Sequence, residues 1–329
     1  MFTPIETSLG ALLLYQSSAG LLKHNGRVFG ISGFLRGCVA RPGSNNIPVV
    51  LGMVSSAVLI SLVAPSLLPS YPPLPDGLEA AMKISGAGVL VGWGTKNGRG
   101  CTSGHMLCGL SRLSLRSFIA TSIFFISALI TANSRMGTPI PPCAGTQPCY
   151  VPSYPSAYEL GFMSATVILA MIINSAVVPC FLRRGKNSES VYGYISGVQF
   201  GLGLLISGMA EPGKVLRFFS WLDLSRFDPS LALVMLFAVG PSLLSYLKLK
   251  REYEDKGGQK PPTLAAHFDL PQNTVKDTDW RFVVGAAVFG VGWGSYGVCP
   301  GPGLLRSLLQ PAWGALWLGG FWLGSLLGL

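Results

Sequence analysis

The chain has 329 residues, of which 49% are hydrophobic and only 12% are charged. Soluble domains usually carry about 25% charged residues, so this composition argues against a large soluble protein. Apolar stretches without a charged residue run over 47–68, 160–182, 191–210, 230–247, 282–305 and 307–329. Several approach the ~20 residues that a helix needs to cross a bilayer. We therefore expect a polytopic membrane protein.

The net charge of +10 could indicate a nucleic-acid partner, but its distribution argues otherwise. If the N-terminus lies outside, most of the 24 Lys and Arg residues fall in inner segments at 23–46, 96–116, 183–191, 248–281 and around Arg306. The outer segments then contain Lys83, Arg135, Lys214, Arg217 and Arg226. This positive-inside bias predicts an outer N-terminus and an inner C-terminus, in a plasma or bacterial inner membrane. No basic patch interleaved with aromatic residues suggests nucleic-acid binding.

In chain order, hydropathy predicts full or nearly full helices at 6–23, 48–69, 81–95, 115–133, 159–182, 190–209, 229–249, 280–295 and 311–328. Shorter helical pieces, bounded by glycine and proline, are expected at 29–37, 103–112, 213–221 and 302–309. About nine longer helices and four half-helices therefore form an all-α membrane fold. Irregular backbone is tolerated at membrane depth only where protein or water hydrogen-bonds to its N–H and C=O groups. The breaks next to the half-helices should therefore line a protected path.

One sequence pattern occurs in both halves of the chain. The glycine-rich segment 86–94 ends in Gly-Trp-Gly and is followed by Cys101, and the similar segment 285–294 is followed by Cys299. A weaker echo links 20–28 to 203–215, so that Arg27 corresponds to Lys214. An odd number of crossings between the copies predicts inverted repeats, over 1–182 and 183–329, within one transmembrane domain. The alternative is chance similarity of two glycine-rich apolar segments.

Two connecting segments stand out. The proline-rich segment 134–158 is expected to be an outer surface loop, in which a Cys143–Cys149 disulfide is one of two alternatives. The polar segment 248–279 is expected to be a flexible inner loop. Near the third half-helix, Glu211 and Lys214 are expected to form an ion pair that anchors a bend.

The segment around Cys101 is dense in glycine and polar residues at membrane depth. Gly100 lets the backbone approach an ion closely, and Thr102 or Ser103 would cap the following short helix. In the second copy, Pro300 or Pro302 would occupy a helix start. Opposed helix N-termini attract anions, and a polarizable thiol at each favours a soft, sulfur-containing anion over phosphate or sulfate.

Other interpretations of these residues remain open. Any membrane cysteine can be a small buried apolar residue, which is the interpretation we favour for Cys180; Cys38 and Cys108 are intermediate cases. His105 is either a proton carrier or a partner of helix-end carbonyls. Cys101, His105 and Cys108 could share one helix face and bind a transition metal, but no carboxylate lies near and helix N-termini repel cations. We therefore expect no metal and no cofactor.

At these residues the chain resembles the YeeE/YedE family of sulfur-compound transporters. The resemblance rests on Asn-Gly-Arg…Gly-Ile-Ser-Gly at 25–33 and on Gly-Cys-Thr-Ser-Gly-His…Cys-Gly-Leu-Ser-Arg-Leu-Ser within 92–117. Segments 197–215 and 285–303 resemble the partner subunit of two-chain members, so the chain resembles a fusion of both. The resemblance implies an hourglass with funnels on both faces and a series of cysteines that passes thiosulfate. Cys101 and Cys299 match two of these cysteines, whereas Gly30 aligns with the third and Cys38 is a candidate substitute.

We therefore expect a permease, not an enzyme, that imports thiosulfate or a related sulfur anion. The substrate-binding residues would be Cys101, Cys299, Cys38, Cys108, His105, Gly100, Thr102 and Gly30. The alternative is a membrane-embedded sulfurtransferase that forms a persulfide on Cys101, with Lys96 or Arg99 lowering the pKa of its thiol. Other expected partners are membrane lipid and, as a candidate, a cytoplasmic sulfur-carrier protein. No carboxylate is expected within a long apolar helix, which favours a passive path over a proton relay.

Overall fold

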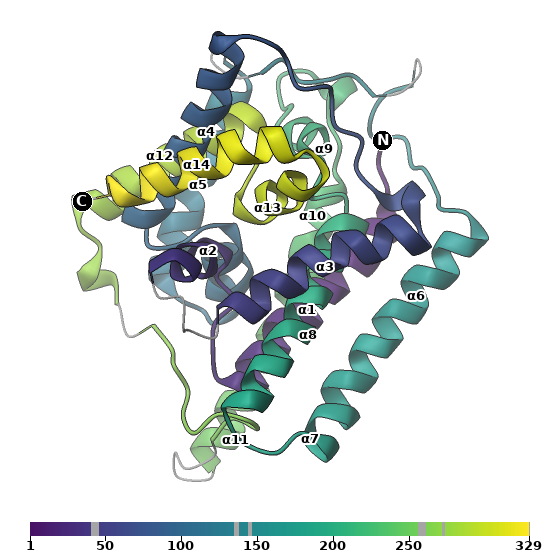
Figure 1. The fold of residues 1–329 in the computed structure, drawn as a ribbon, viewed down its shortest axis with the longest axis vertical. Helices are drawn as coiled ribbons and strands as arrows, with labels where there is room; N and C mark the ends of the chain where they lie inside the picture. The colour runs from purple at the N-terminus through teal and green to yellow at the C-terminus, as the bar shows by residue number, and fades with distance from the viewer. Residues whose placement is uncertain (41–45, 135–137, 144–146, 256–260, 272–273, 329) are drawn as a thin grey trace.

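The computed structural model describes residues 1–40, 46–134, 138–143, 147–255, 261–271 and 274–328, and this part of the chain is almost entirely helical (Figure 1). The α-helices are α1 (Pro4–Asn25), α2 (Ile31–Ala40), α3 (Ile47–Val63), α4 (Leu78–Asn97), α5 (Leu115–Ala132), α6 (Ala157–Ile172), α7 (Val178–Phe181), α8 (Lys186–Ile206), α9 (Pro212–Phe218), α10 (Ser230–Val234), α11 (Gly240–Asp255), α12 (Trp280–Tyr296), α13 (Pro300–Leu309) and α14 (Pro311–Leu326). Three π-helical segments are η2 (Ser103–Gly109), η3 (Ile173–Val177) and η5 (Met235–Val239). Short 3₁₀ turns are η1 (Pro65–Leu67), η4 (Leu224–Arg226) and η6 (Val275–Asp277).

Every predicted helix has a counterpart in this fold. The predicted helices at 159–182 and 229–249 are continuous runs, α6–η3–α7 and α10–η5–α11, each with a π-helical turn in its interior. Among the described residues, four helical runs are long and apolar enough to cross a membrane: Leu115–Ala132, Ala157–Phe181, Ser230–Asp255 and Trp280–Leu309. The all-α, polytopic membrane fold is therefore confirmed.

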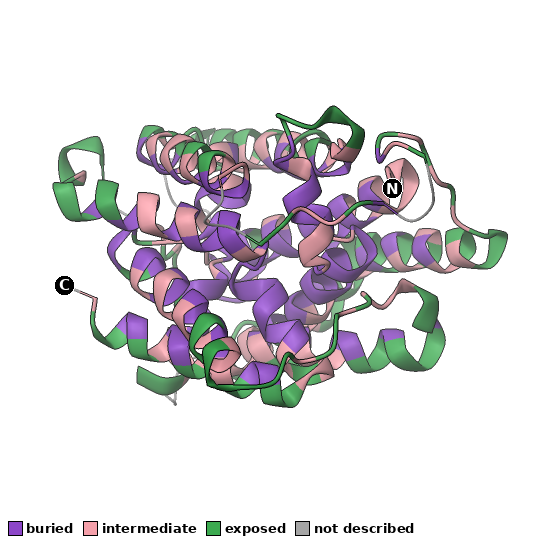
Figure 2. Ribbon diagram, turned by 90° about the horizontal axis from the view of Figure 1, so that it is seen from above, coloured by how far each residue is buried: buried purple, intermediate pink, exposed green. Residues whose placement is uncertain are grey.

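The core lies where the long helices cross. α8 packs between α1 and α3, and α12 packs between α4 and α5, while α14 covers the other side of α4. Buried residues concentrate at these crossings and exposed residues at the periphery (Figure 2). α6 packs along α1 at the edge of the molecule (Figure 1).

The glycine-rich pattern lets the α4 and α12 backbones approach each other. A Cβ on Gly94 would lie 2.4 Å from the Phe289 backbone nitrogen, and one on Gly292 would lie 3.4 Å from the Val91 nitrogen. Gly94 and Gly292 each precede their loop cysteine by seven residues, so the two contacts occur at corresponding positions, although only the Gly94 contact is closer than ordinary van der Waals contact. Aligning the two halves of the chain by these contacts pairs Gly94 with Gly292, whereas aligning the two Gly-Trp-Gly sequences pairs Gly94 with Gly294.

The helix ends define two faces of the molecule. The basic face carries the ends of α1, α4, α7 and α11, the starts of α5, α8 and α12, and the short segments α2 and η2. The disulfide face carries the opposite ends, with α9 and α13, and is named for the bond between Cys143 and Cys149, which the structure contains. The Phe2 backbone N–H donates to the Cys149 carbonyl across this face.

Arg306 lies on the disulfide face, contrary to its predicted grouping with the inner basic residues. Its guanidinium lies 4.8 Å from the ring centre of Tyr71, in the loop between α3 and α4. Gln310, at the end of the same helix, donates to the Pro72 carbonyl in that loop. The reason is that α12 ends at the disulfide face and the chain then turns into the protein at Cys299. From there α13 runs back to the disulfide face, where Gln310 contacts the loop between α3 and α4. Arg135 lies outside the described residues.

The loop between α11 and α12 is anchored over part of its length, so the expectation of a flexible segment is wrong there. The Thr263 and Leu264 N–H groups donate to the Lys23 and His24 carbonyls at the end of α1. Leu264 is completely buried, and its carbonyl accepts from Gly185 before α8. Residues 261–271 therefore hold the end of α1 to the start of α8; residues 256–260 and 272–273 lie outside the described part.

Two expectations about charged residues are also wrong. Glu211 pairs with Arg217 at 2.7 Å, whereas Lys214 is buried and donates to the Thr3 hydroxyl. Arg27, its supposed counterpart, lies in the loop before α2 and donates to the Asn46 side-chain oxygen. The second is the expectation that no carboxylate lies within a long apolar helix: Glu6 lies in the first turn of α1 and Glu159 in the first turn of α6.

Candidate functional site

The two cysteine loops meet inside the molecule. Cys101 follows α4 and is completely buried, and its sulfur lies 3.3 Å from the Ser103 hydroxyl. Thr102 stands at the start of η2 but does not cap it. Its hydroxyl instead donates to the Cys299 sulfur at 3.6 Å. A residue of the first loop therefore contacts the thiol of the second.

Cys299 occupies the position immediately before α13. Its backbone is extended, Pro300 takes the first helical position as predicted, and no side chain caps the helix. The Cys299 side chain is buried, with 5% of its surface exposed. Pro300 and Pro302 have no N–H, so this end of α13 presents one N–H without an intrahelical partner, that of Gly301, together with the positive end of the helix dipole, close to the thiol.

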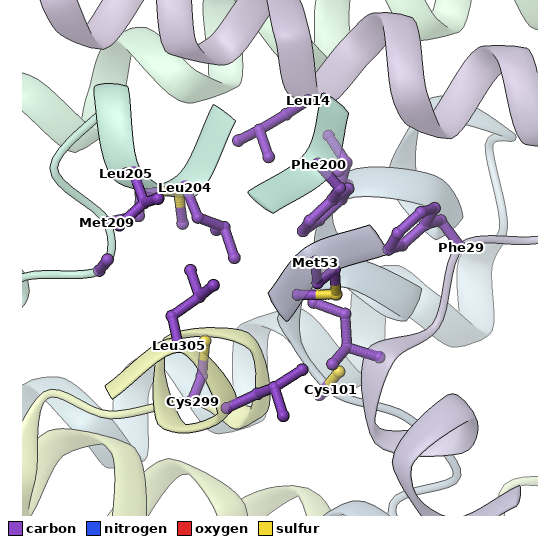
Figure 3. Close-up of a cluster of buried hydrophobic side chains, with 14 of the residues drawn as sticks. Leu14, Phe29, Met53, Cys101, Phe200, Leu204, Leu205, Met209, Cys299 and Leu305 are labelled. Carbon is purple, nitrogen blue, oxygen red and sulfur yellow. The ribbon is translucent and has the colours of Figure 1, made fainter. Parts of the chain in front are cut away.

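Apolar side chains surround both thiols. Figure 3 shows Cys101 and Cys299 within a buried cluster that includes Met53, Leu204 and Leu305. The chain is close-packed here: a Cβ on Gly301 would lie 2.8 Å from the Leu204 side chain and from that of Ile31, at the start of α2. In this arrangement the thiols have almost no contact with solvent.

Arg36 is a candidate residue that the sequence analysis did not single out. It lies on α2, within electrostatic range of Cys101. One nitrogen of its guanidinium, Nη1, is buried without a hydrogen-bond partner. By contrast, Arg99, a predicted cation for the Cys101 thiol, pairs with Asp279 and donates to the Asp277 carbonyl. The only sequence signal for Arg36 is that a basic residue occurs within a predicted half-helix.

His105 uses both ring nitrogens within the protein. Nε2 lies 2.9 Å from the Gly98 carbonyl, to which it must donate, and Nδ1 lies 3.1 Å from the Ser117 hydroxyl. The ring is buried. Gly100 makes room for it, because a Cβ there would lie 2.7 Å from Nε2. This geometry favours the structural interpretation, in which His105 closes the loop before η2 by satisfying a helix-end carbonyl.

The remaining predicted residues, Cys108, Gly30 and Cys38, lie on or next to η2 and α2. Cys108 is buried on η2 and donates to the Phe29 carbonyl at 3.5 Å. Gly30 precedes α2, and a Cβ there would meet no atom within 4 Å. Cys38 lies in the last turn of α2, so about 12 Å of helix separates it from Gly30. Cys180 is exposed near the end of α7.

No group of three metal-ligating side chains occurs among the residues that the structure describes. Cys101 faces Ser103, and His105 is occupied by Gly98 and Ser117. Cys101, His105 and Cys108 therefore have separate partners and do not converge on one point.

Comparison with known proteins gives two family matches and several relatives. Residues 13–130 match a family described as sulphur transport, and residues 189–320 match a family of unknown function, DUF6691. A "probable transporter" of Xylella fastidiosa strain Temecula1 is 42% identical over 129 residues, which is 38% of this chain and 90% of the relative. Another, from strain 9a5c, is 41% identical with the same coverage. A further "probable transporter" of strain 9a5c is 37% identical over 112 residues, 33% of this chain and 68% of the relative.

Proposed function

Because the chain belongs to the sulphur-transport family, which includes the YeeE/YedE proteins, we propose that this membrane transporter imports thiosulfate or a closely related sulfur anion. The anion passes a constriction formed by Cys101 and Cys299. The observation that carries this proposal is the contact between Thr102 and the Cys299 sulfur, which joins the two thiol loops.

The chemistry of the constriction suits a soft anion. A thiol donates weakly through S–H and accepts through a polarizable sulfur, so it can contact the terminal sulfur of thiosulfate. The Gly301 N–H at the start of α13 and the guanidinium of Arg36, whose Nη1 is buried, supply positive potential. The apolar packing around Met53 and Leu204 disfavours a permanently hydrated pore. This packing supports a closed gate, and we propose that it opens by displacement of α2, η2 and α13.

We also propose that residues 1–182 and 183–329 are inverted repeats that face each other across this gate. The contacts of Gly94 with Phe289 and of Gly292 with Val91, which occur at corresponding positions before the two loop cysteines, support the proposal. So does the packing of α4 on α14, which is repeated by the packing of α12 on α5. In transporters of this kind the substrate site lies at the interface between repeats, near the broken helices.

We propose that the disulfide face is outside and the basic face inside, in the plasma or bacterial inner membrane. A disulfide is stable in an oxidising compartment, and inner loops are enriched in Lys and Arg. The chain then begins outside and ends inside, where a cytoplasmic sulfur-carrier protein could receive the anion. Glu6 and Glu159 lie at the outer helix ends, away from the thiols, so passive transport remains our proposal.

The test is uptake of ³⁵S-thiosulfate into proteoliposomes by wild-type, Cys101→Ala, Cys299→Ala and Cys180→Ala proteins. We expect each buried-thiol variant to lose uptake, and the exposed Cys180→Ala control to keep it. Replacing a small buried thiol by a methyl group should cost about 1 kcal/mol of stability, so the variants should remain folded. Normal uptake by Cys299→Ala would contradict a path with two thiols.

Mass spectrometry of the same samples separates the permease from a sulfurtransferase. The permease mechanism predicts unmodified thiols after substrate exposure. A stable persulfide on Cys101, without accumulation of label inside the vesicles, would instead establish the enzyme.

A further inference from the structure

A cavity of about 500 Å³ opens on the basic face beside η2. It lies between α1, η2, η3 and α11, and its lining includes Cys108, Ser111, Arg112, Asn174 and Ser242. Cys108 stands seven residues after Cys101, so the segment that starts at the buried thiol pair ends at this cavity. The cavity is therefore placed to receive an anion that has passed the constriction.

One lining residue indicates that the cavity holds a polar ligand. Ser242 is 94% buried, since 6% of its surface is exposed, and its hydroxyl has no hydrogen-bond partner. A buried hydroxyl without a partner destabilises the fold, because it has lost its hydrogen bonds to water. A bound anion or the water that precedes it would satisfy the group.

A second cavity of about 250 Å³ adjoins the first. It is lined by Arg112, Ser114, Arg116, Ser117 and Tyr246, together with Leu270 and Pro271 of the inner loop. Arg112 and Tyr246 line both cavities. Arg112 is oriented by its Nε, which donates to the Cys108 carbonyl at 3.1 Å. Arg116 is buried over the ring of Phe282.

The charges around the two cavities favour an anion. Besides the two arginines, Lys23 and Lys248 line the larger cavity. Glu252 is the acidic residue in the described lining, and it has an interaction partner of its own. A guanidinium presents several N–H donors in a plane that matches an oxyanion, which a lysine does not.

We propose that the two cavities form a single anion-binding vestibule, with Arg112 as the shared ligand and Arg116 and Ser242 on either side. Its ligand is a small divalent sulfur oxyanion: the transported anion after it leaves the Cys101–Cys299 gate. In this respect the proposal rests on the proposed function. Anion binding itself does not require the thiols, so the two proposals can be tested separately.

The test is equilibrium binding of ³⁵S-thiosulfate and ³⁵S-sulfate to the full-length protein in lipid nanodiscs, at constant ionic strength. The background is Cys101→Ala/Cys299→Ala, which removes the gate thiols. We expect this protein to retain saturable binding of both anions. Adding Arg112→Gln should raise the Kd at least tenfold, about 1.4 kcal/mol, whereas Arg112→Lys should lose less. Ser242→Ala should weaken binding by a smaller factor.

The matched control is Arg281→Gln, which removes the same charge from an exposed residue next to Phe282 that lines neither cavity. Its Kd should equal that of the background. The vestibule is refuted if the thiol-free protein shows no saturable binding, or if Arg112→Gln and Arg112→Lys both bind as the control does. Sulfate binding that depends on Arg112 would support the vestibule whatever the result of the uptake assay. Absence of thiosulfate uptake by the wild type would contradict only the proposed function.

Discussion

The approach of α4 to α12 can be tested by adding one carbon atom. In Gly94→Ala the new Cβ would lie 2.4 Å from the Phe289 backbone nitrogen, where ordinary contact begins at 3.4 Å. α12 would therefore have to retreat by about 1 Å, and backbone cannot rotate away as a flexible side chain can. Overpacking of this kind costs roughly 1–3 kcal/mol. Since Cys299 follows α12 closely, the displacement should also reduce thiosulfate uptake.

The matched control is Gly319→Ala on α14, where a Cβ would meet nothing within 4 Å. There the alanine should be neutral or stabilising by roughly 0.5–1 kcal/mol, because glycine is a poor helix former. Thermal unfolding in detergent compares the two variants, and uptake is measured on the same preparations. If Gly94→Ala unfolds at the same temperature as Gly319→Ala, the tight α4–α12 contact does not exist in the protein.

Two further predictions concern the gate. Thr102→Val keeps the shape of the side chain but removes the donor to Cys299, so initial ³⁵S-thiosulfate uptake should fall about fivefold, as expected for a hydrogen bond of ~1 kcal/mol. Thr102→Ser should keep most of the uptake, and equal rates for the two variants would show that the hydroxyl is not needed. Gly30→Cys should fold as stably as the wild type, because open space surrounds the position and its φ is not positive. It should also transport at least as well, since the family resemblance places a cysteine there; a lower unfolding temperature or slower uptake would contradict this.

The helices were predictable because a bilayer imposes a length and an apolar composition that are visible in the sequence. Even the half-helices were found, since glycine and proline mark their ends, as Pro300 does for α13. The π-helical turns were not, because segments such as Met235–Val239 have no composition that distinguishes them from ordinary helix. Arg306 was assigned to the wrong face because hydropathy does not show that α13 turns back.

The site was predictable in its residue types but not in its contacts. Cys101 and Cys299 were proposed from their loops and are both buried, yet the contact of Thr102 was missed, because capping is a local rule and the partner of Thr102 lies in the other half of the chain. Matching the tryptophans aligns the two halves two residues away from the alignment given by the contacts of Gly94 and Gly292. The anchoring of the inner loop was missed because it uses backbone hydrogen bonds, which leave no pattern in the side chains.

The short connection between α7 and α8 has a consequence for assembly. Each half of the chain contributes a helix that inserts between helices of the other, α8 between α1 and α3 and α4 between α12 and α14. If the halves were separate chains, their association would depend on how much of each the cell made. Joined by residues 182–185, each half meets its partner at an effective concentration on the order of millimolar. The single chain therefore fixes the stoichiometry at one to one, and no half is left in the bilayer with its glycine-lined helices uncovered.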